Sequence, residues 1–237
     1  MNKTSLPSTR VKICGLTRNE DANLAAKLGA WALGFIFYQK SPRFIEAQKV
    51  AEILAQLTSP VSKVVGVFVN PTIDELKNTI AESGVNTIQL HGNESGEFCS
   101  QVRKLFPKHE IIKAIRMDQS SGDENSGSIS HSSLPYHYQL VDSITDRDWG
   151  GTGKTVDWEK AAKLTGLPLI LAGGLTAENV ASAISIVEPY AIDLSSGVES
   201  SPGLKSPSAS ELPLQGFWQT ACWVPRWSVE ASSATTW

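Results

Sequence analysis

Short apolar runs alternate with longer amphipathic segments along most of the chain. Short apolar runs bounded by turn residues are typical of buried strands, and apolar residues at helical spacing are typical of helices. The runs predict strands over residues 11–14, 32–37, 64–69, 87–90, 111–115, 138–141, 169–172 and 191–194. The amphipathic segments predict helices over residues 20–28, 46–57, 73–82, 94–106, 158–164 and 177–187. Such alternation is typical of a parallel sheet whose strands are joined by helical crossovers.

The number of predicted strands and the chain length together favour a closed barrel. A single (βα)8 TIM barrel takes about 250 residues, and this chain has 237. We therefore expect an α/β protein with one catalytic barrel domain over residues 1–205. Catalytic groups of such a barrel lie at the carboxyl ends of its strands, so candidate residues are sought there.

Two segments depart from this alternation. Residues 119–133 are rich in Ser, Gly, Asp, Glu and Asn where a fifth helix would stand, so we expect a loop in its place. Over residues 206–237, Ser, Pro and Ala mix with Trp at no regular spacing, and no eighth helix is recognisable. This atypical Trp-rich tail either covers the barrel or a partner surface, or is poorly ordered.

Composition narrows the classes of partner and site. The net charge of -3 gives the chain no basic field for a polyanion, so we expect no nucleic-acid partner. Residues 1–9 have no apolar signal core and no run approaches the roughly 18 apolar residues of a membrane span, so we expect a cytoplasmic protein without membrane contact. Its cysteines are far apart and form no CxxC pair, which predicts neither a disulfide framework nor a metal site. Monomer and homodimer both stay open.

Cys14 ends the first predicted strand and precedes Gly15, which turns the chain. Strand alternation puts Lys12 on the same face, so Lys12 lies beneath Cys14 if the thiol points into the barrel mouth. A buried ammonium beside a thiol favours the thiolate, which is the basic form, so Cys14 is expected to be a stronger base. The alternative is a buried structural cysteine, since cysteine is among the most buried residue types.

Charged or polar side chains follow three other predicted strands. Arg43 follows the second strand and offers a guanidinium for a carboxylate or phosphate, unless it is a solvated surface arginine. His91 closes the fourth strand on the face of Gln89, either to hydrogen-bond a substrate or as a structurally satisfied histidine. Asp142 closes the sixth strand, where a carboxylate is costly to bury without a role; helix capping is the alternative.

Glycine-rich segments follow the sixth, seventh and eighth predicted strands, and the loops after the seventh and eighth strands are where this barrel class usually binds phosphate. Residues 150–155 are expected to form a flexible lid whose amides meet an anion, and their spacing is not that of a Walker P-loop. The candidate phosphate-binding residues of these segments are Gly151, Gly153, Gly173, Gly174, Ser196 and Gly197, with Asp193 beside the last two. Together these segments predict a phosphorylated small-molecule substrate.

The ordered set of strand-end motifs resembles the phosphoribosylanthranilate isomerase family. The motifs are Lys12-Ile13-Cys14-Gly15-Leu16-Thr17, Ser41-Pro42-Arg43, Gln89-Leu90-His91-Gly92, Gly150-Gly151-Thr152-Gly153 with Asp157-Trp158, Ala172-Gly173-Gly174-Leu175 and Asp193-Leu194-Ser195-Ser196-Gly197-Val198-Glu199. Each is weak alone, but the set in this order is specific and covers about residues 10–205.

The resemblance implies a cofactor-free barrel enzyme of tryptophan biosynthesis. Such enzymes convert N-(5-phosphoribosyl)anthranilate into 1-(2-carboxyphenylamino)-1-deoxyribulose 5-phosphate by an Amadori rearrangement. By the resemblance, Asp142 is the general acid, Cys14 is the base and Arg43 holds the anthranilate carboxylate. The glycine-rich loops would cradle the phosphate, and Asp193 would either orient the substrate or tune its neighbours.

Two other functions remain to be weighed. The same phosphate barrel could serve another substrate, as in indole-glycerol-phosphate synthase or the histidine-pathway aminoaldose isomerases, although those relatives generally lack the Cys14-Gly15-Leu16-Thr17 opening. A catalytically silent barrel kept as a binding or assembly module is the third hypothesis. The intact site motifs argue against it, and the irregular tail argues for it.

Overall fold

The predicted strands close into a barrel. The computed structural model describes residues 9–117, 134–143 and 155–206, and within them β1 to β8 form a closed parallel barrel in chain order. The strands are β1 Arg10–Ile13, β2 Ala32–Ile36, β3 Lys63–Phe68, β4 Thr87–Leu90, β5 Glu110–Met117, β6 Tyr138–Ser143, β7 Leu169–Leu171 and β8 Ala191–Leu194. The predicted TIM barrel is confirmed, and each strand end lies within two residues of its predicted position.

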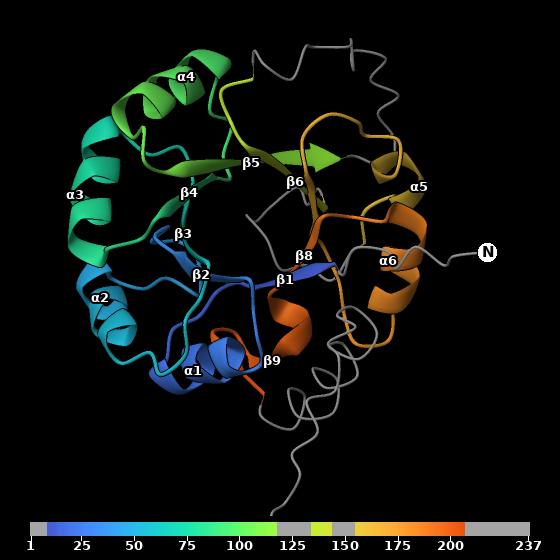
Figure 1. Ribbon diagram of the computed structural model, residues 1–237, viewed down its shortest axis with the longest axis horizontal. Coiled ribbons are helices and arrows are strands. Elements are labelled where there is room, and N and C mark those ends of the chain that lie inside the picture. The colour runs from blue at the N-terminus through green and yellow to red at the C-terminus, as the bar shows by residue number, and fades with distance from the viewer. Residues whose placement is uncertain (1–8, 118–133, 144–154, 207–237) are drawn as a thin grey trace, which may run out of the picture.

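Helices cover the outside of the barrel (Figure 1). They are α1 Asn19–Lys27, α2 Ala47–Ala55, α3 Ile73–Ser83, α4 Gly96–Leu105, α5 Trp158–Ala161 and α6 Val180–Val187. After β8 comes a 3-10 turn, η2 Ser196–Val198, and then a hairpin of β9 Glu199–Ser201 and β10 Leu204–Lys205. The loop expected over 119–133, the glycines at 150–154 and the tail beyond 206 lie outside the described residues.

Helix starts follow local hydrogen bonding. Thr72 and Glu75 form a reciprocal capping box at the start of α3, as the Thr in that turn suggests. Before α6, Thr176 would be a suitable cap, yet Asn179 takes the N-cap position. The Asn179 side chain accepts from the Thr176 amide at 2.9 Å and donates to the Gly174 carbonyl at 2.8 Å. Asn179 thereby fixes the turn after β7 on which Gly173 and Gly174 lie.

Strand alternation divides the apolar side chains into two cores. Val11, Ile13 and Leu33 point outward and pack in the cluster between strands and helices. Cys14 and Ala32 belong to the inner cluster, together with Val65, Val67, Ile112, Leu140 and Ile170. The sharing of one face by Lys12 and Cys14 is therefore confirmed, because period two holds along β1 and just past its end.

Aromatic rings close the amino-terminal end of the barrel. Trp31, just before β2, meets Tyr138 and Tyr190 edge to face, with ring centroids 5.7 Å apart in both pairs. These rings fill the floor of the barrel and leave the carboxyl ends of the strands as the side on which a ligand can enter. Among the helices of the described residues, none has the length and apolar character to cross a bilayer.

Candidate active site

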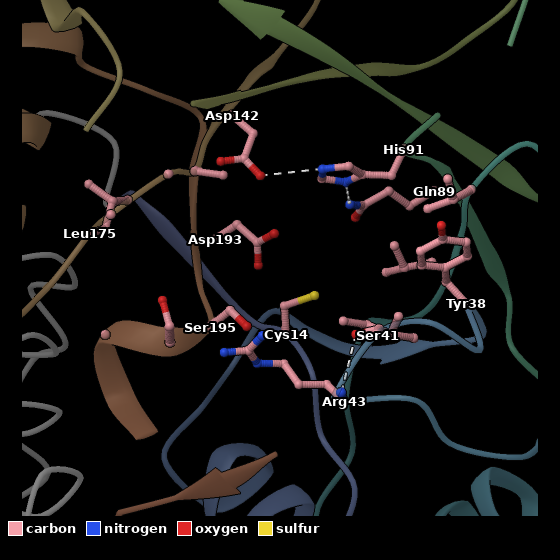
Figure 2. A pocket seen from close by; sticks show the side chains of 18 residues that line it. Cys14, Tyr38, Ser41, Arg43, Gln89, His91, Asp142, Leu175, Asp193 and Ser195 are labelled. Atoms are coloured by element: carbon pink, nitrogen blue, oxygen red, sulfur yellow. Dashed lines mark hydrogen bonds and ion pairs between the residues drawn. The ribbon is translucent and has the colours of Figure 1, made fainter. Parts of the chain in front are cut away.

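A pocket opens at the carboxyl ends of the strands and gathers the predicted site residues (Figure 2). The predicted residues that line it are Cys14, Arg43, His91, Asp142, Gly173, Gly174, Asp193, Ser196 and Gly197. Gly151 and Gly153 lie outside the described residues. Residues separated by most of the chain meet here because each follows a different strand of one barrel.

Cys14 lies above a buried ion pair. The parallel register of β1 and β8 places Lys12 opposite Asp193, and the Lys12 Nζ donates to Asp193 Oδ2 at 2.8 Å. The Lys12 side chain is fully buried. Asp193 Oδ1 has no hydrogen-bond partner in the described part of the chain. A buried, unpaired carboxylate oxygen at the edge of a pocket is an acceptor available to a ligand hydroxyl.

The charges around Cys14 change its pKa in opposing directions. Burial raises the thiol pKa and the Asp193 carboxylate raises it further, whereas Lys12 and Lys205 lower it. The net effect raises the thiol pKa, although Lys12 acts on it in the expected direction. Lys12 does favour the thiolate, but desolvation disfavours any charge in so dry a place and outweighs the lysine. Burial also lowers the pKa of Lys12, and Asp193 and Cys14 overcome this, so its pKa is raised.

A missing side chain makes room for the thiol. Gly34 faces Cys14 from β2, and a Cβ at that position would lie 2.9 Å from Cys14 Sγ and 3.1 Å from Lys12 Nζ. Both distances are too short for ordinary packing, so the pair of Lys12 and Cys14 needs glycine at this position of the neighbouring strand. The sequence gives no local sign of this requirement.

Asp142 faces the same pocket from β6, across from Cys14 (Figure 2). Its Oδ2 lies 3.3 Å from His91 Nε2, and both side chains are 14% exposed. The Gln89 amide nitrogen lies 2.8 Å from His91 Nδ1. These contacts fit the tautomer in which Nδ1 accepts from the amide and Nε2 bears the proton that faces the Asp142 carboxylate. These contacts join the end of β4 to the end of β6, and they give both ring nitrogens of His91 a polar partner inside the site.

Arg43 is buried rather than solvated. Its Nη2 lies 2.7 Å from Glu199 Oε2 and its Nε donates to both Glu199 oxygens, with exposed side-chain fractions of 9% and 4%. The alternative of a solvated surface arginine is therefore wrong. Nη1 makes no hydrogen bond within the residues that the structure describes, so one edge of the guanidinium still offers donors to the pocket.

The loops after β7 and β8 need their glycines. Gly173 has a φ of +81°, and a Cβ there would lie 2.9 Å from Asp142 Oδ1. A Cβ on Gly197 would lie 1.9 Å from the Leu175 carbonyl oxygen, which no side chain tolerates. The two loops therefore pack backbone against backbone. Residues of both loops line the pocket with little side chain between their backbone and a ligand, which is the arrangement in which peptide N–H groups bind an anion.

Sequence reasoning did not select several residues that build this site. Gln89 carried a signal, because alternation on β4 places it beside His91. Glu199 ends one of the motifs but was given no role, because its partner Arg43 is far away in the chain. Gly34 and Lys205 carried no signal, since their contacts with Cys14 join different strand ends of the barrel. Among the described residues, no group of three or more His, Cys, Asp or Glu side chains is arranged to hold a metal ion.

Comparison with known proteins agrees with this geometry. The family model described as N-(5'phosphoribosyl)anthranilate (PRA) isomerase matches residues 11–210. A protein of Geotalea uraniireducens named N-(5'-phosphoribosyl)anthranilate isomerase is 46% identical over 203 residues, which are 84% of this chain and 94% of that protein. The crystal structure of phosphoribosyl anthranilate isomerase from Thermotoga maritima has a TM-score of 0.75 at 36% identity and covers 87% of this chain and 97% of its own.

A further solved structure bears on the ligand. It is a phosphoribosyl anthranilate isomerase in complex with reduced 1-(o-carboxyphenylamino)-1-deoxyribulose 5-phosphate. The two chains are 34% identical with a TM-score of 0.71, over 90% of this chain and 98% of that one.

Proposed function

Since the chain belongs to the N-(5'-phosphoribosyl)anthranilate isomerase family, we propose that its barrel mouth performs the family's reaction with Cys14 as base and Asp142 as acid. The reaction converts N-(5-phosphoribosyl)anthranilate into 1-(2-carboxyphenylamino)-1-deoxyribulose 5-phosphate, a step of tryptophan biosynthesis. The observation that carries the proposal is the placement of a thiol and a carboxylate across one pocket from each other, beside two glycine-rich loops.

Asp142 protonates the ring oxygen of the ribose as the C1–O bond breaks, and the electrons of the anthranilate nitrogen form the C1=N iminium. Cys14 then removes the proton from C2, and the C–H electrons move towards the cationic nitrogen to give an enolamine. Tautomerisation of the enolamine gives the aminoketose. The positive nitrogen of the substrate serves as the electron sink, so the chemistry asks of the protein one acid and one base.

The two anionic ends of the substrate fit the two sides of the pocket. Arg43 presents its free edge to the anthranilate carboxylate, and a charge-assisted hydrogen bond there is stronger than a neutral one. Backbone N–H groups donate to the phosphate from Gly173, Gly174, Ser196 and Gly197, with Gly151 and Gly153 as further candidates. Asp193 Oδ1, the unpaired buried oxygen, accepts from a sugar hydroxyl. The substrate is thus held at both ends with C1 and C2 between the acid and the base.

A fluorescence assay of phosphoribosylanthranilate turnover tests the proposal. Cys14→Ala and Asp142→Asn should each lose roughly 10²- to 10⁴-fold in kcat, the usual contribution of a general acid or base. Cys99→Ala and Asp74→Asn are the matched controls, because Cys99 is a buried cysteine on α4 and Asp74 an exposed aspartate on α3. Folded variants of Cys14 or Asp142 with near-parental rates would remove that residue from the mechanism.

The same assay separates the other functions. Turnover of the histidine-pathway aminoaldose in place of phosphoribosylanthranilate would favour the second enzyme, and no turnover of either would favour a silent binding module. The expected cytoplasmic location and the choice between monomer and homodimer stay predictions.

A further inference from the structure

Lys205, at the end of β10, is a buried lysine that the proposed chemistry does not use. Its side chain is 5% exposed. The ammonium donates to the Cys14 carbonyl at 2.6 Å, the Ser195 carbonyl at 3.2 Å and Glu199 Oε1 at 2.7 Å. An ammonium has three N–H donors, so all of them are used. One side chain thereby joins the loop after β1 to the loop after β8.

The Cys14 carbonyl belongs to the proposed base, and the Ser195 carbonyl belongs to the proposed phosphate-binding loop after β8. In a planar trans peptide the C=O and the next N–H point in opposite directions. Fixing the Ser195 carbonyl therefore fixes the direction of the Ser196 N–H in the loop that lines the pocket. Fixing the Cys14 carbonyl holds the backbone of the proposed base from one side, while its N–H donates to the Leu194 carbonyl at 2.8 Å on the other.

Glu199 extends this link to the proposed carboxylate-binding side chain. It accepts from Lys205 through Oε1 and from Arg43 through both oxygens. The Arg43 stem passes against Gly15, where a Cβ would lie 2.6 Å from Arg43 Cδ. Two cations share one carboxylate, so the cluster keeps a net positive charge beside a pocket meant for an anion.

The hairpin that carries Lys205 is itself tied to the first loop. Thr17 Oγ1 donates to the Gly203 carbonyl, and the Lys205 N–H donates to Asp21 Oδ2 at 3.1 Å. Lys205 is therefore held at its backbone as well as at its ammonium. A side chain fixed at both ends transmits a displacement of one loop to the other, because buried, fully bonded groups have no freedom to absorb it.

We propose that Lys205, acting with Glu199, is a positioning residue that couples binding of the substrate phosphate at the β8 loop to the placement of the Cys14 thiol and Arg43. The inference rests on the proposed function for its reaction, but the coupling itself is a property of the site. The short hairpin of β9 and β10 thus aligns Cys14 with the phosphate-binding loop and with Arg43. Removing the ammonium leaves the Cys14 and Ser195 carbonyls without this donor and lets the two loops move independently.

Lys205→Met is the variant that tests the coupling, with inorganic phosphate as the probe. We expect the inhibition constant of phosphate to rise roughly 10-fold and kcat to fall roughly 10- to 100-fold, as for the loss of charge-assisted hydrogen bonds. Alkylation of Cys14 by iodoacetamide across pH, followed by mass spectrometry, is the second readout. The charged groups facing the thiol are Lys12, Asp193 and Lys205, and loss of Lys205 should raise the apparent thiol pKa because that lysine lowers it.

Lys113→Met is the matched control. Lys113 on β5 is a mostly buried lysine, 12% exposed, which donates to Glu94 at 2.8 Å and to the carbonyls of Gly92 at 2.8 Å and Ala114 at 3.1 Å. Its loss should cost comparable thermal stability, since it too frees buried carbonyls. Phosphate inhibition and the alkylation profile of Cys14 should stay as in the parent, because Lys113 contacts neither loop.

Equal changes in the two variants, or none in Lys205→Met, would overturn the inference in favour of a purely structural lysine. Should Lys205→Met fail to fold, hydrogen exchange on the parent decides. Saturating phosphate should then protect the Cys14–Gly15 peptide as well as the Ser195–Ser196 peptide, and protection of the second alone contradicts the coupling. Phosphate binding, alkylation and exchange need no turnover, so a parent without isomerase activity refutes the proposed function and leaves this inference standing.

Discussion

The surroundings of Cys14 and of Asp142 are built from different interactions, although both face one pocket. Around Cys14 lie fully charged groups in a dry place: Lys12, Asp193 and Lys205. Around Asp142 lie hydrogen-bonding groups, the His91 ring and the Ser143 N–H, which donates to Oδ1 at 2.7 Å. The exposed fraction of the Asp142 side chain is 14%, while Cys14 is 6% exposed.

This difference suits the two proposed roles. A base that takes a proton from carbon benefits from a dry place, where the thiolate is little solvated and its position is fixed by ion pairs. An acid must recover its proton after each turnover, which a partly exposed carboxyl beside an imidazole can do through solvent. We therefore expect activity and thiol reactivity to depend on charge and volume around Cys14. Around Asp142, we expect activity to depend on hydrogen bonds.

Lys12→Met should give the largest effect. It leaves Asp193 buried without its cation, and breaking a buried pair from one side costs about 3–5 kcal/mol of unfolding free energy. The apparent pKa of Cys14 should rise further, because Lys12 lowers it, so alkylation at a fixed pH should slow. Urea unfolding and alkylation rates measure the two effects. Lys49→Met, in an exposed pair with Glu52, is the control that should change neither. An unchanged alkylation profile in Lys12→Met would refute the influence of Lys12 on the Cys14 thiol.

Gly34→Ala tests whether the Cys14 side is also limited by volume. The added Cβ would lie 2.9 Å from Cys14 Sγ, and overpacking of this kind costs about 1–3 kcal/mol of unfolding free energy. Displacement of the base should lower kcat by roughly 100-fold. Gly96→Ala is the control, since a Cβ there meets no atom within 4 Å. Parental kcat in a folded Gly34→Ala would mean that the thiol tolerates displacement.

Gln89→Leu tests the hydrogen-bonded side. Without the amide donor, His91 no longer keeps a single tautomer towards Asp142, and loss of one neutral hydrogen bond predicts a decrease in kcat of roughly 3- to 10-fold. The alkylation profile of Cys14 should not change, because Gln89 is not among the charged groups around the thiol. Gln48→Leu, on α2, is the exposed control. A shift in thiol reactivity would show that the two sides are not separate.

Glu199→Gln leaves Arg43 and Lys205 buried without their shared carboxylate, and its effect is visible in the pH dependence of stability. Burial raises the pKa of Glu199, but Arg43 and Lys205 lower it more, so its pKa in the folded protein lies below the ordinary 4.5. A lowered carboxyl pKa stabilises the fold above the unfolded value and loses this effect as the pH falls through the folded value. The stability deficit of Glu199→Gln should therefore be full near neutral pH and shrink below about 4.5. Glu52→Gln is the exposed control, and a deficit that grows in acid would contradict the charge pairing.

Local pattern was enough for much of the fold because each βα unit carries its own signal. The run 87–90 predicts β4 and the run 191–194 predicts β8 with the bounds observed, since large apolar residues recur at every second position of both strands. The helix expected over 177–187 begins only at Val180. There the Asn179 side chain accepts from the Thr176 N–H, and Asn179 takes the N-cap position. The sequence alone does not decide between Thr176 and Asn179 as the N-cap.

Candidate residues at strand ends were predictable for the same reason. A barrel brings all carboxyl ends of its strands to one rim, so Cys14, Arg43, His91 and Asp142 had to be neighbours once the barrel was expected. Their partners were not predictable. Arg43 could have pointed to solvent, and nothing near it in the chain names Glu199 as its partner.

The sequence by itself determined the barrel, the face on which Lys12 and Cys14 lie and the rim on which the site is built, because hydrophobic period and strand order are local properties. Only the tertiary structure decided the electrostatics of Cys14. A thiol pKa depends on the balance of desolvation, Asp193, Lys12 and Lys205, and that balance is set by distances between strands at opposite ends of the chain. For the same reason, Lys205 reaches Cys14 only because β8 pairs with β1 in the closed barrel.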